Sequence, residues 1–318
     1  MLPRFLQRDD PVRIQRSPDA GYRLLDSGRQ CKLEQFGEYV LQRPCAQAVW
    51  SPLKERLWSE ADAVFRRDTS GTGNWKTQRK IPEHWEIDFA ELRWEIRPNH
   101  FGNVGIFAEQ EGCWSWLRQT AASLGVPKQE IEVLNLFGYT GGSSLQLARE
   151  GVRVVHLDAS KTSIGQARTN AELSSLQEAP IRWITDDAVK FVQREQRRDR
   201  RYTGIVLDPP TFGRGTRGET WKIDEDILSL LSACVQILDS ERGFLLLTSH
   251  SPGYTPLVLE NLLSSMFEDM GVTHTGKLDS GEMVICEEET GRPLPSGAFA
   301  GWSAQPSATE VPRGHDPR

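Results

Sequence analysis

Short apolar runs alternate with segments of helical spacing between residues 130 and 290, and this alternation limits the possible folds most strongly. The runs are too short for buried helices and are rich in Val, Ile and Leu, as buried strands are. They occupy residues 131–136, 152–157, 181–184, 204–207 and 244–248. The helical segments that follow them occupy residues 143–149, 164–173, 188–198, 223–238 and 257–266. Repeated strand–helix units join through right-handed crossovers, so we expect a doubly wound parallel sheet.

The pattern changes after residue 270. Gly271–Gly276 and Glu282–Cys286 are two further strand-like segments, separated by a Gly/Asp/Ser turn without a helix. Such a pair predicts a hairpin that adds antiparallel strands to the sheet. Together with the five strands above, the predicted fold class is α/β, with a Rossmann-like seven-stranded sheet and a terminal antiparallel hairpin.

Composition divides the chain into three parts. Seven of the ten tryptophans lie at or before residue 116, among short extended segments that prolines interrupt. We predict a small β-rich module at 1–105, with the tryptophans as its core rather than as a base-stacking platform. The sheet domain would occupy 106–290. The remaining residues, 291–318, contain five Pro and four Gly without periodicity and would be a flexible tail.

Length, charge and cysteine usage exclude several classes of protein. The 318 residues suffice for about two domains. No apolar run is long enough to span a bilayer, and the first ten residues lack the apolar core of a signal peptide. The five cysteines are scattered and form no Cys-x-x-Cys pair, which argues against a disulfide framework and a zinc site. We therefore expect a cytoplasmic protein without membrane or metal, and the net charge of −6 gives no global reason to expect nucleic acid.

A glycine-rich turn follows the first predicted strand of the sheet. It runs from Asn135 to Ser144, and Asp158 lies at the end of the second strand, where a carboxylate can accept both hydroxyls of a ribose. The glycines are spaced Gly-x-x-Gly-Gly and not Gly-x-Gly-x-x-Gly. This favours S-adenosylmethionine, which has no pyrophosphate, over NAD, while a plain turn with a surface Asp is the structural alternative. Asp186 and Asp187 follow the third strand, where one carboxylate can contact an adenine amino group and one can cap the next helix.

The fourth strand ends in Asp208-Pro209-Pro210-Thr211-Phe212. Proline fixes φ and has no N–H to donate, so the double proline ends the strand and leaves carbonyls at its tip. In a parallel sheet this edge binds ligands. A carboxylate, carbonyls and an aromatic ring there predict a site for a flat, nitrogen-bearing substrate, against the alternative of an ordinary strand-ending turn.

Four motifs in this order resemble the class I S-adenosylmethionine-dependent methyltransferases. They are residues 135–142, 156–161, 185–188 and 207–212. More closely, residues 100–290 resemble the large-subunit ribosomal RNA methyltransferases of the RlmI/RlmK type. The segment at 105–110 is similar to the family segment that closes over the cofactor. The N-terminal part, with 24–28 and 49–50, is similar to that of short bacterial members without a separate RNA-binding (PUA) domain.

The resemblance implies roles for individual residues. The cofactor would be bound by Phe107, Gln110, Asn135, Phe137, Gly138, Tyr139, Thr140, Gly141, Asp158, Ser160, Lys161, Asp186 and Asp187. The methyl group and the target base would be faced by Asp208, Pro209, Pro210 and Phe212, with Phe212 stacking on the base.

The positions at which cysteine is absent narrow the choice of the atom that would be methylated. Methylation of a pyrimidine C5 requires a thiolate nucleophile. Cytosine-C5 members of the family place this cysteine in the loop after the fifth strand, and other cytosine-C5 methyltransferases place it beside the motif-four proline. Those places hold Thr248-Ser249-His250 and Pro210-Thr211, and Cys234 falls inside a predicted helix. A nitrogen needs only in-line positioning of methyl and lone pair, so we favour a guanine nitrogen. His250 could act as a base or contact the substrate, or be an ordinary loop histidine.

The acidic charge conflicts with an RNA substrate unless it is compensated locally. Residues 190–222 hold nine Lys/Arg against four Asp/Glu, and Arg214 and Arg217 follow the double-proline turn, where they could contact phosphates. The arginine run at 194–201 is expected at the opposite edge of the sheet, as a solvated helix end. Ribosomal RNA is the expected partner. The alternatives are a protein or small-molecule methyltransferase, and a catalytically silent S-adenosylmethionine-binding factor in ribosome assembly.

Overall fold

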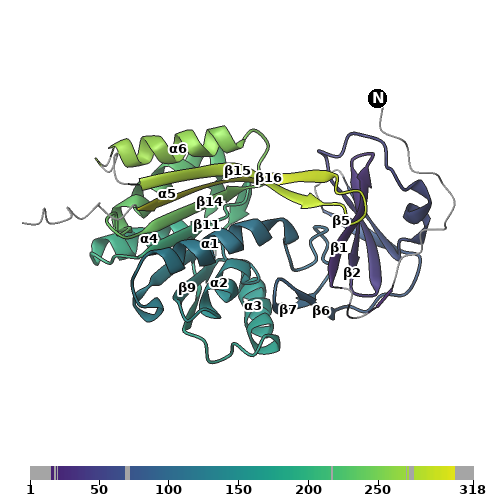
Figure 1. Ribbon diagram of the computed structural model, residues 1–318, viewed down its shortest axis with the longest axis horizontal. Coiled ribbons are helices and arrows are strands. Elements are labelled where there is room, and N and C mark those ends of the chain that lie inside the picture. Colours follow the sequence, from purple (N-terminus) through teal and green to yellow (C-terminus); the bar gives the residue numbers. More distant parts are fainter. Residues whose placement is uncertain are drawn as a thin grey trace, which may run out of the picture. The chain divides into compact units, whose positions relative to one another are not determined.

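The computed structural model describes residues 16, 17, 19, 21–68, 72–215, 218–269, 271 and 276–304. The chain forms two compact units, each made of separate stretches of sequence (Figure 1). The first unit consists of residues up to Glu91, Ile96–Val104 and Cys286–Leu294. The second consists of Leu92–Glu95, Gly105–Ile285 and the residues from Pro295 onward. No helix in the described part of the chain is long and apolar enough to cross a membrane.

A five-stranded sheet is the centre of the first unit. Its strands are β1 (Tyr22–Gly28), β2 (Cys31–Phe36), β3 (Tyr39–Pro44), β4 (Ala63–Arg67) and β5 (Gly73–Thr77), in that order. All neighbours are antiparallel except β3 and β4. The short helix η2 (Glu55–Glu60) places Leu57 in the core beside Leu33 and Val40. Two further strands, β6 (Trp85–Phe89) and β7 (Leu92–Ile96), form a separate pair. The small β-rich N-terminal domain is thus confirmed.

A buried charge cluster connects the N-terminal and C-terminal stretches of the first unit, through Asp26 on one side and Glu287 and Arg292 on the other. The guanidinium of Arg292 donates to the Glu287 carboxylate at 2.6 and 3.0 Å and to Asp26 Oδ1 at 3.0 Å. Both carboxylates are fully buried. The Arg292 guanidinium also lies over the Trp50 ring, 5.5 Å from its centroid. Because a buried carboxylate is costly unless paired, this arginine is what makes two of them tolerable in one place.

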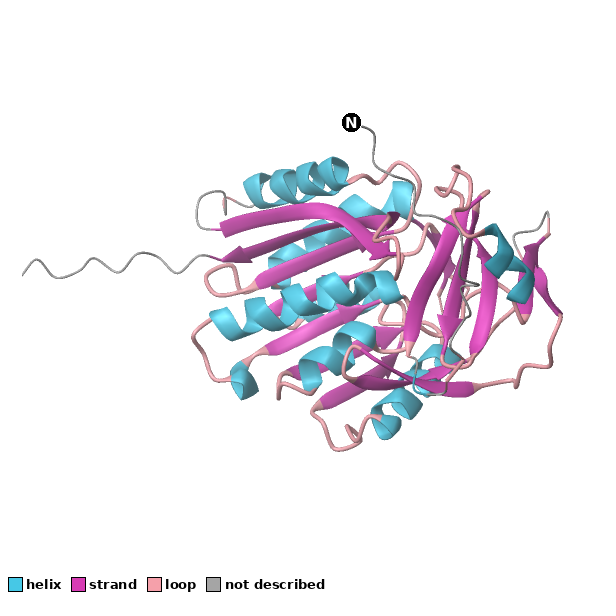
Figure 2. Ribbon diagram, turned by 45° about the vertical axis from the view of Figure 1, so that its right-hand side comes forward, coloured by secondary structure: helices cyan, strands magenta, loops and turns pink. Residues whose placement is uncertain are grey.

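The second unit is built on a seven-stranded sheet in the order β10-β9-β8-β11-β14-β16-β15. Its first five members are parallel: β8 (Glu132–Leu136), β9 (Arg153–Asp158), β10 (Ile181–Thr185), β11 (Gly204–Leu207) and β14 (Phe244–Ser249). The last two, β15 (Gly276–Cys286) and β16 (Pro293–Ala304), form a long hairpin, with β16 antiparallel to β14 (Figures 1 and 2). The predicted α/β fold class is confirmed.

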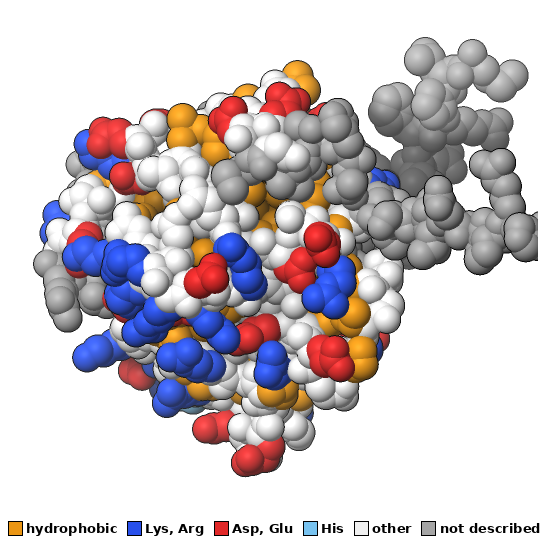
Figure 3. All heavy atoms as spheres, turned by 90° about the vertical axis from the view of Figure 1, so that its left-hand side faces the viewer, with side chains coloured by type: hydrophobic (Ala, Val, Ile, Leu, Met, Phe, Trp, Pro, Cys, Tyr) orange, Lys and Arg blue, Asp and Glu red, His pale blue; other side chains and the backbone are white. Residues whose placement is uncertain are grey.

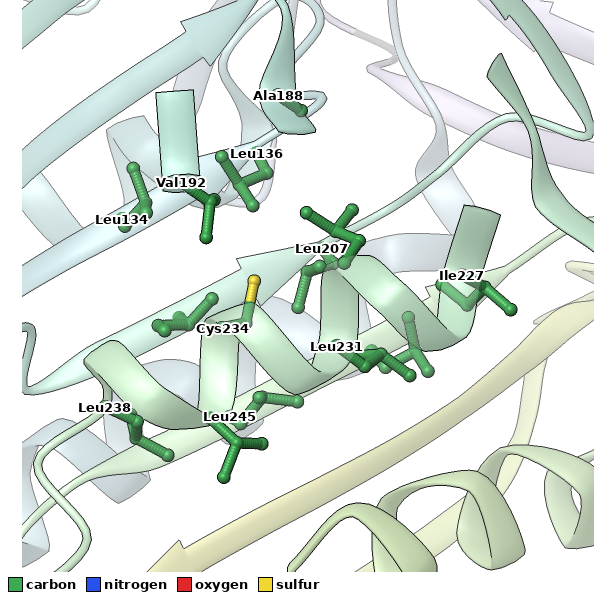
Figure 4. Packing of buried hydrophobic residues seen from close by; sticks show 14 of the residues in the cluster. Leu134, Leu136, Ala188, Val192, Leu207, Ile227, Leu231, Cys234, Leu238 and Leu245 are labelled. Atoms are coloured by element: carbon green, nitrogen blue, oxygen red, sulfur yellow. The ribbon is translucent and has the colours of Figure 1, made fainter. Parts of the chain in front are cut away.

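Helices cover both faces of this sheet. They are α1 (Glu111–Ser123), α2 (Gly142–Ala148), α3 (Lys161–Leu173), α4 (Ala188–Arg197), α5 (Ile223–Ile237) and α6 (Pro256–Asp269). One apolar cluster contains α1 and α2 residues, and another contains residues of α4, α5 and α6. In the cluster of α4, α5 and α6, Leu231 and Cys234 of α5 and Leu238, directly after this helix, pack with Leu207 and Leu245 of the sheet (Figure 4). Cys234 is therefore a buried helix residue, as its sequence position predicts.

The C-terminal predictions need correction. Residues 293–304, which we expected within a flexible tail, form β16, and this strand is the partner that completes the hairpin. Its central buried positions hold the small side chains Ser296, Ala298 and Ala300, whereas the large buried Leu294 and Trp302 lie near its ends, so its period-two pattern is faint in the sequence. The predicted strand at 282–286 is the end of the longer β15. Within the other predicted strand, residues 272–275 lie outside the described residues, as do 305–318 of the tail.

Replacing Arg292 by Ala should destabilise the first unit by about 3 kcal/mol, because Asp26 and Glu287 would remain buried without their cation. Urea unfolding followed by tryptophan fluorescence measures this loss. Arg29→Ala is the matched control, since Arg29 pairs with Glu55 in solvent and should cost less than about 1 kcal/mol. Equal losses for the two variants would contradict the role given to the buried cluster.

Candidate active site

The carboxyl ends of the five parallel strands meet at one edge of the second unit's sheet. A pocket opens there, between the turn after β8 and the ends of β11 and β14. Its walls are formed by Trp94, Ile106, Phe107, Gln110, Trp114, Asn135, Phe137, Gly138, Tyr139, Thr140, Gly142, Ser143, Val206, Asp208 and Thr248. Eight of these residues are among those predicted from the sequence to bind a cofactor or substrate. No group of His, Cys, Asp and Glu side chains in the described ranges could hold a metal ion.

The turn between β8 and α2 has an unusual backbone. Phe137 and Tyr139 have φ of 57° and 49°, and Gly141, at the start of α2, has φ of 97°. Non-glycine residues with positive φ cost energy and cluster at functional sites. A Cβ on Gly138 would lie 2.5 Å from the ring of His156, so only glycine fits there. The glycine spacing thus reflects a tight turn that passes directly over a buried ring.

His156 and its partners form the floor of this turn. The Asn135 amide donates to Ser144 Oγ at 2.8 Å, and Ser144 Oγ lies 2.9 Å from His156 Nδ1. Since the amide occupies the hydroxyl oxygen as acceptor, the hydroxyl hydrogen can be donated to Nδ1. Burial lowers the pKa of His156 to about 3, against an opposing effect of the Tyr139 backbone. His156 is therefore a neutral structural residue near pH 7.

Asp158 ends β9 and connects the turn to the next helix. Its Oδ2 accepts the Tyr139 N–H at 2.9 Å, and its Oδ1 accepts the Ser160 N–H at 2.8 Å. Burial raises the pKa of Asp158, and these two N–H groups oppose the rise. Ser160 caps α3 through a bond from the Ser163 N–H, and the exposed Lys161 is the first residue of that helix. A carboxylate has about four acceptor positions, so two remain for the paired hydroxyls of a ribose.

The two acidic residues after β10, Asp186 and Asp187, have different partners. Asp187 is the N-cap of α4 and accepts the Lys190 N–H at 2.9 Å. Asp186 forms an ion pair with Arg194, which lies in the last turn of α4. The capping role that the sequence allows for one of the pair is thus confirmed for Asp187. Adenine binding by these residues stays a prediction.

Asp208 follows β11 and accepts hydrogen bonds from two other segments. Its Oδ1 accepts the Thr248 hydroxyl of β14 at 2.7 Å, and its Oδ2 accepts the Gln110 amide at 3.1 Å. Gln110 also donates to Thr248 Oγ1 at 3.2 Å. The carboxylate is therefore fixed in orientation while still lining the pocket.

His250 lies beside Asp208 and carries a charge. Its Nδ1 is 3.4 Å from Asp208 Oδ1, and its Nε2 is 3.4 Å from Oε1 of the buried Glu109. Burial alone lowers the pKa of His250, but Asp208 and Glu109 outweigh it and raise the pKa to about 10. The raised pKa favours the protonated imidazole, which cannot accept a further proton, so it disfavours the option of a base. Substrate contact by His250 stays a prediction.

The double-proline turn projects an aromatic ring into solvent. Pro209 is buried and Pro210 exposed, and the Pro210 carbonyl accepts the Trp221 indole N–H at 2.7 Å. Beyond it, β12 (Phe212–Arg214) and β13 (Thr220–Lys222) form a two-stranded hairpin. The Phe212 side chain is 55% exposed, which is high for a phenylalanine. The ring is thus available to a ligand.

The predicted phosphate contacts are only partly described. Arg214 is exposed at the end of β12, while Arg217 lies outside the described residues. The arginine run at 194–201 closes α4 and precedes β11, so it lies toward the sheet edge where the strands begin. Lys and Arg side chains gather on that face (Figure 3), but Arg198 pairs with Glu195 and Arg200 with Glu132. These pairs agree with a solvated helix end.

Several residues of the site were not found from the sequence. Trp94 and Trp114 stack with ring centroids 5.6 Å apart and line the pocket, although their signal was assigned to the core of the N-terminal module. No local pattern in the sequence marks Thr248 and Glu109 as partners of Asp208 and His250. Cys113 of α1 is buried, and burial together with the Asp208 charge raises its pKa to about 12, so it is no thiolate.

These residues fit S-adenosylmethionine. The turn brings backbone N–H groups and a Cβ-free glycine to the pocket, and Asp158 keeps acceptor positions for a ribose. The pocket wall then passes from the tryptophan pair to Asp208, so a methyl donor bound at the turn would lie beside that carboxylate.

Comparison with known proteins gives concordant results. A family model described as "S-adenosylmethionine-dependent methyltransferase" matches residues 42–260. The crystal structure of a SAM dependent methyltransferase from Agrobacterium tumefaciens has 39% identity, covers 90% of this chain and 91% of its own, and has a TM-score of 0.82.

Two curated relatives match shorter stretches. The ribosomal RNA large subunit methyltransferase K/L of Shewanella loihica is 34% identical over 123 residues, which are 38% of this chain and 17% of that protein. The ribosomal RNA large subunit methyltransferase I of Aeromonas salmonicida is 38% identical over 81 residues, which are 25% of this chain and 20% of that protein. The chain thus matches no more than a fifth of the length of either protein.

Gly138→Ala should weaken S-adenosylmethionine binding by about tenfold or more, because the added methyl group must displace either the His156 ring or the turn. Isothermal titration measures the affinity. Gly165→Ala in α3 is the matched control, since an added Cβ there meets nothing within 4 Å. Unchanged affinity in Gly138→Ala would show that the turn does not hold the cofactor.

Proposed function

Because the chain belongs to the S-adenosylmethionine-dependent methyltransferases, and its resemblance to the RlmI/RlmK type is confirmed, we propose that it methylates a guanine nitrogen in ribosomal RNA. The observation that carries the proposal is the orientation of Asp208 at the pocket, four residues before the exposed ring of Phe212. A carboxylate that accepts from a base edge and a ring that stacks on its face are the two contacts that recognise an unstacked base.

The proposal of an RNA substrate rests on the names of the relatives and on the exposed hairpin of β12 and β13. The curated relatives are ribosomal RNA methyltransferases by name, and single bases are commonly recognised by stacking on aromatic side chains. Phe212 and Arg214 lie on one exposed hairpin, so a base and a neighbouring phosphate can be contacted together. The net charge of −6 makes such local contacts necessary.

The choice of nitrogen rests on the residues around Asp208. The cofactor supplies an electrophilic methyl group on a sulfonium. Asp208 would accept an N–H of the base and hold the attacking nitrogen in line, which is catalysis by positioning. The Pro209 carbonyl accepts no hydrogen bond from the described residues and offers a second acceptor at the same edge. Cys113 interacts electrostatically with Asp208, but its thiol is protonated and buried. This disfavours a C5 reaction, which needs a thiolate.

The function is tested by mapping modified nucleosides in ribosomal RNA from a strain that lacks the gene. We expect one methylguanosine to disappear from one position and to return when the wild-type gene is restored. The Asp208→Asn gene should fail to restore it. If every ribosomal nucleoside is unchanged, the RNA proposal fails, and a protein, a small molecule or a noncatalytic assembly role takes its place.

Asp208→Asn should lower methyl transfer by about 100-fold or more while S-adenosylmethionine affinity stays within about threefold, because the carboxylate would contact the target rather than the cofactor. Single-turnover transfer and isothermal titration measure the two quantities. Asp199→Asn, at a side chain 88% exposed, is the control and should match wild type in both. Loss of cofactor binding in Asp208→Asn would assign Asp208 to the cofactor instead.

A further inference from the structure

His250 bridges two carboxylates that come from distant parts of the sequence. Glu109 belongs to the short helix η3 (Ala108–Gln110), and Asp208 follows β11. Each ring nitrogen of His250 is 3.4 Å from one of these acids. The Phe107 ring lies 5.4 Å from the imidazole, centroid to centroid, and shields it on another side. One side chain therefore connects the pocket carboxylate to a buried acid behind it.

The charges in this cluster favour the bridge. Glu109 is only 8% exposed, and a cation between it and Asp208 reduces the repulsion between the two carboxylates. A neutral imidazole could donate from one nitrogen only, whereas an imidazolium donates from both. The charged groups that face the His250 ring, among the described residues, are Asp208 and Glu109. Cys113 of α1 interacts with Asp208 but is uncharged.

The bridge also decides how Asp208 is oriented. Its Oδ1 is in contact with both the Thr248 hydroxyl and His250 Nδ1, while its Oδ2 accepts one bond, from Gln110. Of about four acceptor positions on a carboxylate, three are thereby used. The remaining position is on Oδ2, the oxygen held by the pocket-lining Gln110.

We propose that Glu109 and His250 are positioning residues, in which the buried Glu109 fixes an imidazolium at His250 and that cation holds Asp208 in the orientation that leaves one Oδ2 position open to the substrate. This positioning proposal depends on the proposed function only for the identity of the substrate. The account predicts that His250 keeps its proton across the physiological range. It also predicts that removing either neighbouring charge returns the ring to ordinary titration, near about pH 6.5.

The titration is measured by NMR on protein with labelled histidine rings, without cofactor or RNA, and His250→Asn identifies the signal. In wild type the His250 signal should not move between pH 5.5 and 8.5, which extends from about one unit below to about two units above the ordinary midpoint. In Glu109→Gln and in Asp208→Asn it should titrate within that range. Glu111→Gln, an exposed neighbour of the same chemistry, should behave as wild type. Wild-type titration inside the range, or no change in both test variants, overturns the proposal.

Transfer to ribosomal RNA provides the second readout. Glu109→Gln should lose about tenfold in kcat as the pH rises from 6.5 to 8.5, because the ring then becomes neutral, while KM for the cofactor stays within about twofold. The wild-type kcat should be flat over the same interval. A flat profile in Glu109→Gln overturns the positioning role. If wild type transfers no methyl group to this RNA, the proposed function fails, and the NMR titration still decides the present proposal.

Discussion

The site depends on how one carboxylate, Asp208, is held. Its donors come from β14, from η3 and from the loop after β14, and parallel sheet topology brings these segments to one edge. Strand β11 lies between β8 and β14, so its end is adjacent both to the glycine turn and to Thr248. The fold therefore brings the glycine turn and an oriented acceptor to the same pocket.

The buried ring of His156 beneath the glycine turn is a second constraint, because it must stay neutral and lies close to Gly138. Its ring is completely buried and lies against Gly138, while Ser144 bonds to its Nδ1. The two histidines that the structure describes in the second unit, His156 and His250, thus have opposite states for one physical reason. His156 is buried without an anion and stays neutral, whereas His250 lies between two anions and stays charged.

The sequence predicts most of the sheet because its central strands are continuous apolar runs, and Asp158 and Asp208 mark strand ends. It fails at β16, where Ala298 and Ala300 fill positions that larger residues would reveal. The partners of Asp208 could not be predicted either. Glu109 and Thr248 acquire their roles only when the fold brings them to β11, and no local pattern records that proximity. The charge on His250 is a consequence of the same proximity.

The central claim is that this pocket places a methyl group on a guanine nitrogen by positioning alone. The most direct measurement is reaction of the purified protein with methyl-deuterated S-adenosylmethionine and ribosomal RNA from the deletion strain. The RNA is then digested and the labelled nucleoside identified by mass spectrometry. The account predicts the label in methylguanosine, on nitrogen. A label on C5 of a pyrimidine would contradict it, since that reaction requires a cysteine thiolate at the site.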